Sequence, residues 1–168
     1  MKNILFLLAL TVLLFGCGKK KYADEYMKEA KLGIEQNKIP ETVKAYETLL
    51  SEFPDDSLAP EALYQLGTLY QNKMVPNVKE TESMEKAVTI FKSVFDKYPE
   101  SKQAPVSLFM AGFIQANDLK KYQEATATYN LFLQKYPKNE MVPAAKDEIN
   151  NMGLTPEQII AKKVVTKK

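Results

Sequence analysis

The 168-residue chain is poor in the side chains that usually carry out catalysis. It contains no histidine and no arginine, so the commonest general base and the bidentate phosphate clamp are both missing. Acidic pairs such as Asp24-Glu25 and Asp55-Asp56 could act as hydrolytic carboxylates or metal ligands. Both pairs lie at expected helix ends, however, where carboxylates stabilise the helix dipole. The sequence therefore predicts no enzyme, no metal site and no cofactor.

Cys17 is the one residue for which the sequence indicates a specific chemistry. It is the only cysteine, so it cannot form an internal disulfide. It follows Lys2 and an apolar run of the length of a secretory h-region. Residues 14–17, Leu-Phe-Gly-Cys, resemble the bacterial lipobox, although Phe15 is larger than the usual residue. The resemblance implies that residues 1–16 are a lipoprotein signal peptide and that acylated Cys17 inserts into a lipid bilayer.

The residues around Cys17 also indicate a location. Gly18 is not an aspartate, which under the bacterial sorting rule favours the outer membrane, with the chain facing the periplasm. Residues 17–21 are then the lipidated N-terminus and its tether. An ordinary signal peptide with an incidental cysteine is the alternative. Since Lys2 is the only charge before Cys17, the remaining chain has a net charge of +1, which gives no reason to expect nucleic acid.

Three stretches of the chain share one pattern, and they divide it into units. Residues 53–60, 98–105 and 136–143 each begin with an aromatic residue and a proline, and each has a second proline six residues after the first. Pro54, Pro99 and Pro137 are 45 and 38 residues apart. A period of this length is typical of stacked helical hairpins. The longer first interval isolates an insertion, residues 72–81, whose polar composition favours a solvated loop.

The spacing of apolar residues and prolines predicts the helices themselves. They are expected at residues 22–36, 41–53, 60–71, 83–98, 105–116, 120–136 and 143–153. Ser83 is the expected N-cap of the fourth helix, and Gly153 the expected C-cap of the seventh. Residues 22–153 would form one repeat domain whose polar last helix caps the stack. Residues 154–168 would be a short helix or a flexible basic tail.

Within the hairpins the sequence resembles the tetratricopeptide repeat. That pattern places Leu-Gly and then Tyr in the first helix, and Ala, an aromatic residue and Pro around the second. The second unit carries it most completely, in Leu66, Gly67, Tyr70, Ala87, Phe91 and Pro99. The third unit has Gly112, Ala125, Tyr129 and Pro137, and the first is weaker, with Gly33, Tyr46 and Pro54. The resemblance implies an all-α, right-handed superhelix of about three hairpins plus a C-terminal capping helix.

The aromatic-proline links look more particularly like those of two families of bacterial envelope proteins. One is the BamD family of outer-membrane assembly lipoproteins, and the other is the CpoB (YbgF) family, whose C-terminal repeat domain works with the Tol-Pal system. The chain looks too short for the five repeats of the first family, and it lacks the N-terminal coiled coil of the second. The resemblance covers residues 22–153 and implies a shared architecture rather than a particular pathway.

In repeats of this kind, the first helix of each hairpin lines a concave groove that holds a peptide segment or a partner helix. The repeat pattern assigns the groove positions to Met27, Ile34, Tyr64, Thr68, Gln71, Phe109, Phe113 and Ala116. Tyr64, Phe109 and Phe113 are large and apolar without belonging to the repeat's core pattern. They are therefore the expected contacts with a partner protein. The alternative is that they pack against each other or against the C-terminal tail.

Together these features predict a non-enzymatic, lipid-anchored scaffold or adaptor of the bacterial envelope, monomeric outside its complex, which binds an envelope protein or peptide segment. The resemblance to the BamD family suggests outer-membrane protein assembly as its pathway. One alternative is a Tol-Pal-linked coordination protein. Another is an accessory glycan-binding lipoprotein of an uptake system, although the absence of tryptophan counts against sugar binding.

Overall fold

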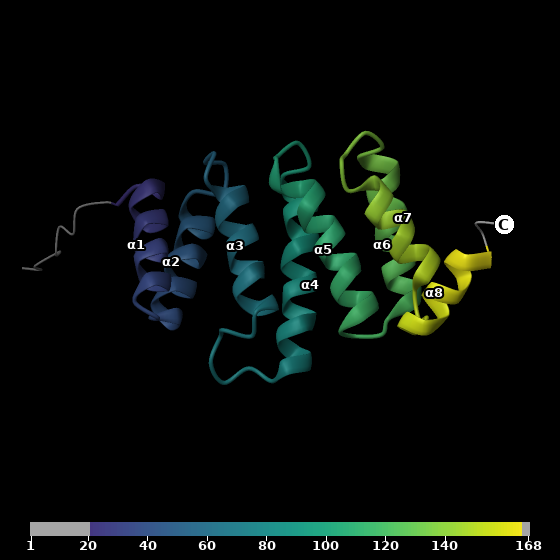
Figure 1. The fold of residues 1–168 in the computed structure, drawn as a ribbon. Coiled ribbons are helices and arrows are strands. Elements are labelled where there is room, and N and C mark those ends of the chain that lie inside the picture. Colours follow the sequence, from purple (N-terminus) through teal and green to yellow (C-terminus); the bar gives the residue numbers. More distant parts are fainter. Residues whose placement is uncertain (1–20, 166–168) are drawn as a thin grey trace, which may run out of the picture.

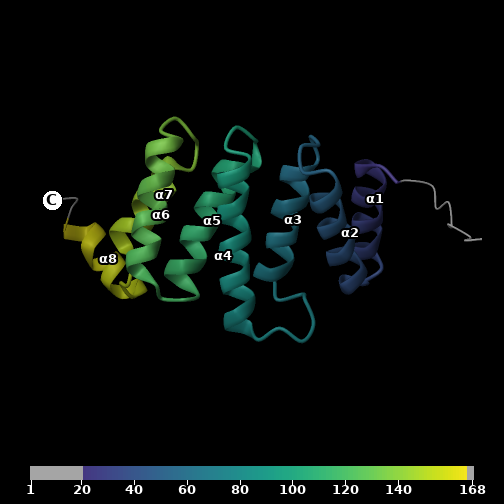
Figure 2. The same ribbon diagram turned by 180° about the vertical axis from the view of Figure 1, so that it is seen from behind.

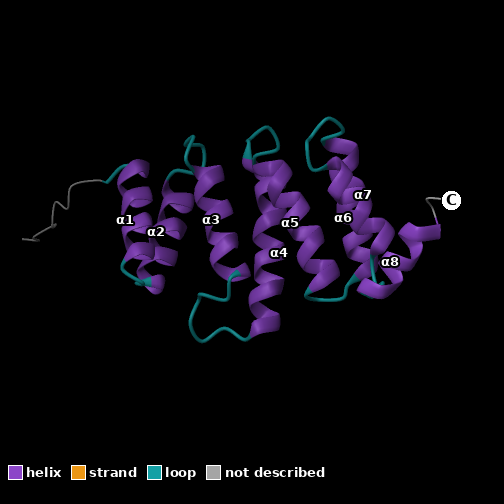
Figure 3. Ribbon diagram, in the orientation of Figure 1, coloured by secondary structure: helices purple, strands orange, loops and turns teal. Residues whose placement is uncertain are grey.

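The computed structural model describes residues 21–165, and its side chains from 21 to 162. The predicted signal peptide and Cys17 lie outside the described residues. This part of the chain is entirely helical, which confirms the all-α repeat fold (Figure 3). Its eight helices are α1 (Ala23–Glu35), α2 (Ile39–Glu52), α3 (Ala59–Gln71), α4 (Glu80–Lys97), α5 (Gln103–Asn117), α6 (Tyr122–Lys135), α7 (Val142–Asn151) and α8 (Pro156–Val165).

The helices follow one another across the molecule in chain order, and the views from front and back agree (Figures 1 and 2). The pairs α1–α2, α3–α4 and α5–α6 are the three predicted hairpins, and each also packs against its neighbour in the chain. The core consequently runs along the stack as three adjoining clusters. One joins α1, α2 and α3, the next joins α4 and α5, and the last joins α5, α6 and α7.

The three proline links have the same backbone conformation, which is the structural basis of their sequence similarity. In each link the amide of the fourth residue donates to the carbonyl of the aromatic residue, at 3.1 Å for Asp56, 3.0 Å for Ser101 and 3.0 Å for Asn139. The carbonyls of these same residues each accept a bond from the amide three residues later. These tight turns place the second proline in the first turn of the next helix, where its missing N–H costs nothing.

The links are also joined to one another. The Tyr98 hydroxyl donates to the Pro54 carbonyl at 2.8 Å, and the Tyr136 hydroxyl donates to the Pro99 carbonyl at 2.9 Å. Each tyrosine thus bonds to the proline of the preceding link. The first link begins with Phe53, which has no hydroxyl, and no earlier link precedes it among the described residues. Tyrosine therefore occurs in the two links that have a preceding link to bond to, and phenylalanine occurs in the first link.

Removing one of these hydroxyls tests their contribution. Tyr98→Phe should lower the free energy of unfolding by about 0.5–1.5 kcal/mol, because one net hydrogen bond is lost while the ring stays in place. Urea denaturation measures the change. Tyr129→Phe is the matched control, since the buried Tyr129 hydroxyl has no hydrogen-bond partner among the described residues, and its removal should not destabilise the fold. Equal losses in the two variants would contradict the role of the link.

Close approach within the hairpins explains the glycines of the repeat pattern. A Cβ atom at Gly67 would lie 2.8 Å from the Phe91 ring, and one at Gly112 would lie 3.0 Å from the Tyr129 ring. Real Cβ atoms are essentially never found within 3.0 Å of a heavy atom elsewhere in the fold, so a side chain at position 67 would force the Phe91 ring to shift. The two helices of each of these hairpins therefore cross closely at the glycine.

The fourth helix begins earlier than its sequence suggests, and the prediction for Ser83 is wrong. Helix α4 starts at Glu80 with Lys79 as its N-cap, so the insertion ends there. Ser83 is buried in the helix, and its hydroxyl donates to the Tyr70 carbonyl at 2.6 Å. That carbonyl lies in the last turn of α3, where it also accepts the Lys73 amide at 3.0 Å. Ser83 thus ties α4 to the end of α3 and does not cap the start of its own helix.

A further helix follows α7 within the described residues. Helix α7 ends at Asn151, and Gly153 follows with φ of 77°, the left-handed conformation that glycine adopts readily after a helix. Helix α8 then spans ten residues. None of its described side chains is buried.

Candidate functional site

The predicted groove aromatics lie on the first helices of their hairpins, but they are half-buried rather than free. The Tyr64 ring centroid on α3 is 5.7 Å from that of Phe91. The Phe109 centroid on α5 is 5.5 Å from Tyr129 and 6.0 Å from Phe132. Tyr64 and Phe109 therefore do not stand apart from the core: each covers a core aromatic of its own hairpin and exposes only part of its surface. Phe113 is half-buried as well.

The other predicted groove positions divide by burial. Met27 is only 4% exposed and packs in the cluster of α1, α2 and α3, whereas Ala116, also 4% exposed, lines a cavity shared with α7 and α8. Ile34 is 36% exposed on α1. Thr68 and Gln71 are half-buried on α3, and the Thr68 hydroxyl donates to the Tyr64 carbonyl at 3.0 Å. The repeat pattern predicted correctly which helices carry these residues. Their exposure to solvent depends on the neighbouring helices, which the pattern does not describe.

Four half-buried apolar side chains lie on α3 and α5, the first helices of their hairpins. Tyr64 and Met110 pack against one cluster, which includes Phe91 and Ala111. Phe109 packs against the next cluster, and Phe113 follows it by four residues, so these two rings share one face of α5. We call Tyr64, Phe109, Met110 and Phe113 the α3–α5 strip. The repeat pattern did not include Met110. Its long apolar side chain was the signal in the sequence that could have identified it.

A polar contact joins the same two helices. The Glu61 carboxylate on α3 accepts hydrogen bonds from Gln65 at 2.8 Å and from Gln103 on α5 at 2.5 Å. Burial opposes its ionisation, but these bonds and the charges of Lys102 and Lys31 hold its pKa below the usual value. Glu61 is therefore a fixed negative charge between α3 and α5, and it stabilises the fold above the pKa of an ordinary glutamate.

A second surface, which the groove prediction did not include, lies on the first hairpin. This α1–α2 groove has a volume of about 540 Å³, and every residue that lines it comes from α1, α2 or the segments beside them. Its walls include Tyr26, Leu32, Gly33, Lys44 and Thr48. Leu32 is 51% exposed, a large fraction for a leucine in a repeat hairpin. No other described helix covers the groove.

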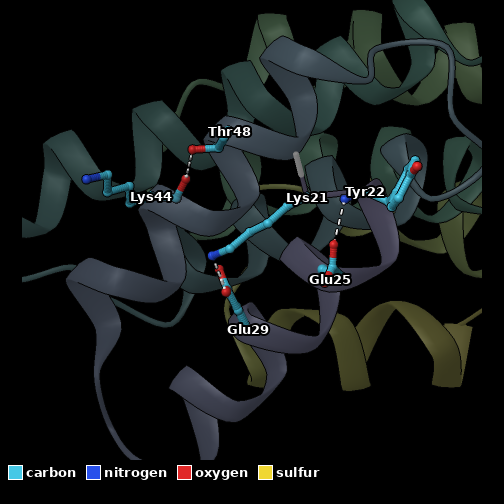
Figure 4. Close-up of polar contacts among 6 residues, drawn as sticks. All are labelled: Lys21, Tyr22, Glu25, Glu29, Lys44 and Thr48. Atoms are coloured by element: carbon cyan, nitrogen blue, oxygen red, sulfur yellow. Dashed lines mark hydrogen bonds and ion pairs between the residues drawn. The ribbon is translucent and has the colours of Figure 1, made fainter. Parts of the chain in front are cut away.

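Polar contacts form at and beside one edge of this groove (Figure 4). The Lys21 ammonium forms an ion pair with Glu29 and lies 5.5 Å from the centroid of the Tyr26 ring. The Tyr22 amide donates to the Glu25 carboxylate at 2.9 Å, which closes the start of α1, and the Thr48 hydroxyl donates to the Lys44 carbonyl at 2.8 Å. Between these contacts the lining of the groove is mainly apolar.

The described residues contain no cluster that indicates catalysis. No group of three or more His, Cys, Asp or Glu side chains in residues 21–162 is placed to hold a metal ion. Within that part of the chain, no helix is both long and apolar enough to cross a membrane. A further cavity between α5, α7 and α8 has a mixed lining that includes Asp147, Asn117 and Ile159.

Comparison with known proteins agrees with the geometry. Residues 61–101 and 106–139 match the model of the tetratricopeptide repeat. The match supports a tetratricopeptide-repeat protein. The two matched segments begin in α3 and α5 and end within the links that follow α4 and α6. Tetratricopeptide repeats typically serve as non-catalytic scaffolds for protein–protein interaction. A search of curated proteins gives no match.

The hairpin that precedes the matched segments keeps the repeat geometry. Gly33 lies where a Cβ atom would be 2.3 Å from the Thr42 hydroxyl oxygen, the counterpart of the approaches at Gly67 and Gly112. Thr42 is fully buried and donates to the Lys38 carbonyl at 2.9 Å. A small hydroxyl side chain thus stands near the place that a ring occupies in the later tetratricopeptide units.

Buried tyrosines predict how the repeat array responds to alkali. Burial raises the pKa of Tyr46 to about 12, with a further contribution from the charge of Glu61. Burial also raises the pKa of Tyr98, Tyr129 and Tyr136. Unfolded tyrosines lose their protons near about pH 10, while the folded ones keep theirs. The stabilisation is therefore complete below about pH 10 and is lost as the pH rises toward about 12.

The urea midpoint should accordingly fall between about pH 10 and about pH 12, together with a late rise in tyrosinate absorbance. Tyr46→Phe should reduce the slope of that decline, because one buried titrating group is removed. A midpoint that stays constant over this range would contradict the role of the buried tyrosines.

Proposed function

We propose that this chain is a non-enzymatic adaptor of the bacterial cell envelope, which binds a partner protein through the α3–α5 strip of its tetratricopeptide repeats. The observation that carries the proposal is the position of the strip. All of its residues lie within the two segments that match the repeat, and on the first helices of their hairpins. The match itself supports a protein-interaction scaffold, and the half-buried aromatic side chains are the kind that dominate binding energy in protein interfaces.

The form of the strip favours a peptide segment or a single helix as the bound part of the partner. Its rings rest on Phe91, Tyr129 and Phe132, so they are already ordered before a partner arrives. A preformed surface loses little side-chain entropy on binding. Glu61 lies on α3, is bonded to Gln103 on α5 and is ionised, so a basic residue of the partner beside these helices would be favoured.

We also propose that the adaptor is anchored in the outer membrane and faces the periplasm. This proposal rests on the lipobox-like residues 14–17 and on Gly18, all of which precede the described residues. Two or more acyl chains on Cys17 would give stable anchoring, whereas a single chain would give only marginal binding. The resemblance of the proline links to the BamD family is the reason for proposing outer-membrane protein assembly as the pathway.

Site-directed photocrosslinking tests the binding surface. A photoreactive residue at Phe113 or Thr68 should capture the same discrete protein in cells that produce the chain natively. The matched control is the same residue at Lys92, which is exposed on α4. Phe113→Asp should then abolish capture from position 68 without unfolding the chain. Equal capture from all three positions, or none from positions 68 and 113, would refute the strip as the binding surface.

Metabolic labelling tests the anchor separately. The wild-type chain should incorporate a palmitate analogue and sediment with outer membranes. Cys17→Ser should lose both the label and the membrane association, because it removes the only thiol. Membrane association that persists in the unlabelled variant would rule out Cys17 as the anchor, and it would leave the strip proposal untouched.

A further inference from the structure

The described array begins close to the proposed lipid anchor. Cys17 precedes Lys21, the first described residue, by four positions. An extended chain spans at most about 3.5 Å per residue, so Lys21 lies within about 14 Å of an acylated Cys17. The start of the first hairpin is therefore held beside the membrane. This step rests on the proposed anchoring of Cys17.

The α1–α2 groove is the surface that begins at this point. Lys21 belongs to its lining, and Tyr22, the next residue, is 68% exposed. Leu32, on the mainly apolar part of the lining, is 51% exposed. Tyrosine is enriched where proteins meet the headgroup region of a bilayer, and leucine on one face is typical of helices that lie in that region. The exposed side chains at this end thus suit a membrane surface.

The charges that line the groove suit phospholipid headgroups. Three lysines and two glutamates line it, and one lysine and one glutamate of these pair with each other. Lys38, Lys44 and Glu41 form no ion pair among the described residues. Lys19 and Lys20, which precede the described residues, add two cations beside the anchor. Lysines at this position are attracted to anionic headgroups.

The remaining acidic residues of the first hairpin do not oppose this contact directly. Helices α1 and α2 carry seven acidic residues, and five of them lie outside the lining of the groove. The unpaired charges of the lining are therefore two lysines and one glutamate. A surface of phosphate-bearing headgroups is favoured over a basic protein as the occupant.

The short tether makes a weak contact sufficient. A surface joined to its binding site by a short flexible linker meets it at an effective concentration on the order of mM. A contact too weak to recruit a free protein to a membrane is consequently populated once the chain is anchored.

We propose that the α1–α2 groove docks on the phospholipid surface that holds Cys17, with Leu32 and Lys44 among the headgroups. Helices α1 and α8 lie at opposite ends of the molecule in both views, so the array then extends away from the membrane (Figures 1 and 2). The α3–α5 strip is held at a set distance above the bilayer and stays open to a partner. Docking thus orients the binding surface, which an anchor on a free tether would not do.

A single tryptophan reports the contact, because the chain has none of its own. The core clusters begin at Ala23, so a chain that starts at Cys17 keeps the whole described array. Its only thiol is coupled to a maleimide-bearing lipid in vesicles of phosphatidylethanolamine and phosphatidylglycerol. Leu32→Trp should show blue-shifted emission that brominated lipids quench. Ile160→Trp, at an exposed residue of α8, should show neither effect.

Two further changes in the Leu32→Trp chain identify the cause of the quenching. Lys44→Glu should weaken it, whereas Lys92→Glu, at an exposed residue of α4, should leave it unchanged. Inserting about twenty glycine and serine residues after Gly18 should lower the ratio of docked to free chains by about tenfold, because the effective concentration falls with linker length.

Circular dichroism establishes that all of these variants remain folded. Absence of quenching in Leu32→Trp would overturn the proposal. Equal quenching of the tryptophans at positions 32 and 160 would also overturn it, because the array would then not stand on its first hairpin. So would quenching that both Lys44→Glu and the longer linker leave unchanged. The maleimide anchors the chain whether or not cells acylate it, so a failure of palmitate labelling would refute the cellular anchor without changing these measurements.

Discussion

Phe91→Ala should lower the free energy of unfolding by about 3–5 kcal/mol, the range for truncating a buried phenylalanine. Phe91 is fully buried on α4 and belongs to the cluster that joins α4 to α5. Its ring also supports Tyr64 on α3 and fills the space beside Gly67. Truncation would therefore leave a cavity where three helices meet, and the rigid neighbouring helices can close it only in part.

Urea denaturation measures this effect as a lower midpoint. Lys92→Ala is the control, since Lys92 is the next residue and is exposed, and its replacement should change stability by no more than about 0.5 kcal/mol. The response should be cooperative, because each repeat unit is stabilised mainly by its neighbours. A loss below about 1 kcal/mol for Phe91→Ala would mean that the helices close the cavity, and it would contradict the packing described.

Gly67→Ala should also destabilise the fold, by about 1–3 kcal/mol, even though alanine is the better helix former. The added Cβ would lie 2.8 and 2.9 Å from two atoms of the Phe91 ring and 3.3 Å from a methyl group of Ile90. The ring cannot move aside because it is fully buried. Steric overlap therefore outweighs the gain of about 1 kcal/mol in helix propensity.

A double-mutant cycle isolates the overlap. Phe91→Leu removes the ring edge that faces Gly67, so Gly67→Ala should cost much less in that background than in the wild type. Coupling between the two positions of about 1 kcal/mol or more is the expected result for residues in direct contact. Additive effects would show that the glycine is required for some reason other than the approach of Phe91.

The sequence by itself determined the links, the hairpins and the fold class. The proline links are local structures, closed by hydrogen bonds between residues three apart, so their pattern can be read without any knowledge of distant contacts. The prolines and the 3.6-residue periodicity likewise set most helix ends to within about two residues. Even the close approaches at Gly67 and Gly112 follow from the repeat pattern, because each pairs two helices of one hairpin.

Only the tertiary structure decided which residues reach solvent and which do not. Ser83 has the sequence of an N-cap, yet it bonds to the end of α3, an acceptor thirteen residues away. Met27 and Leu32 are both apolar residues of α1, but one is in the core and the other is half exposed. Burial depends on the helix that packs alongside, and at the ends of the array no described helix does so. The packing of each helix against its neighbours, which no local sequence pattern encodes, therefore determines which side chains remain exposed for binding.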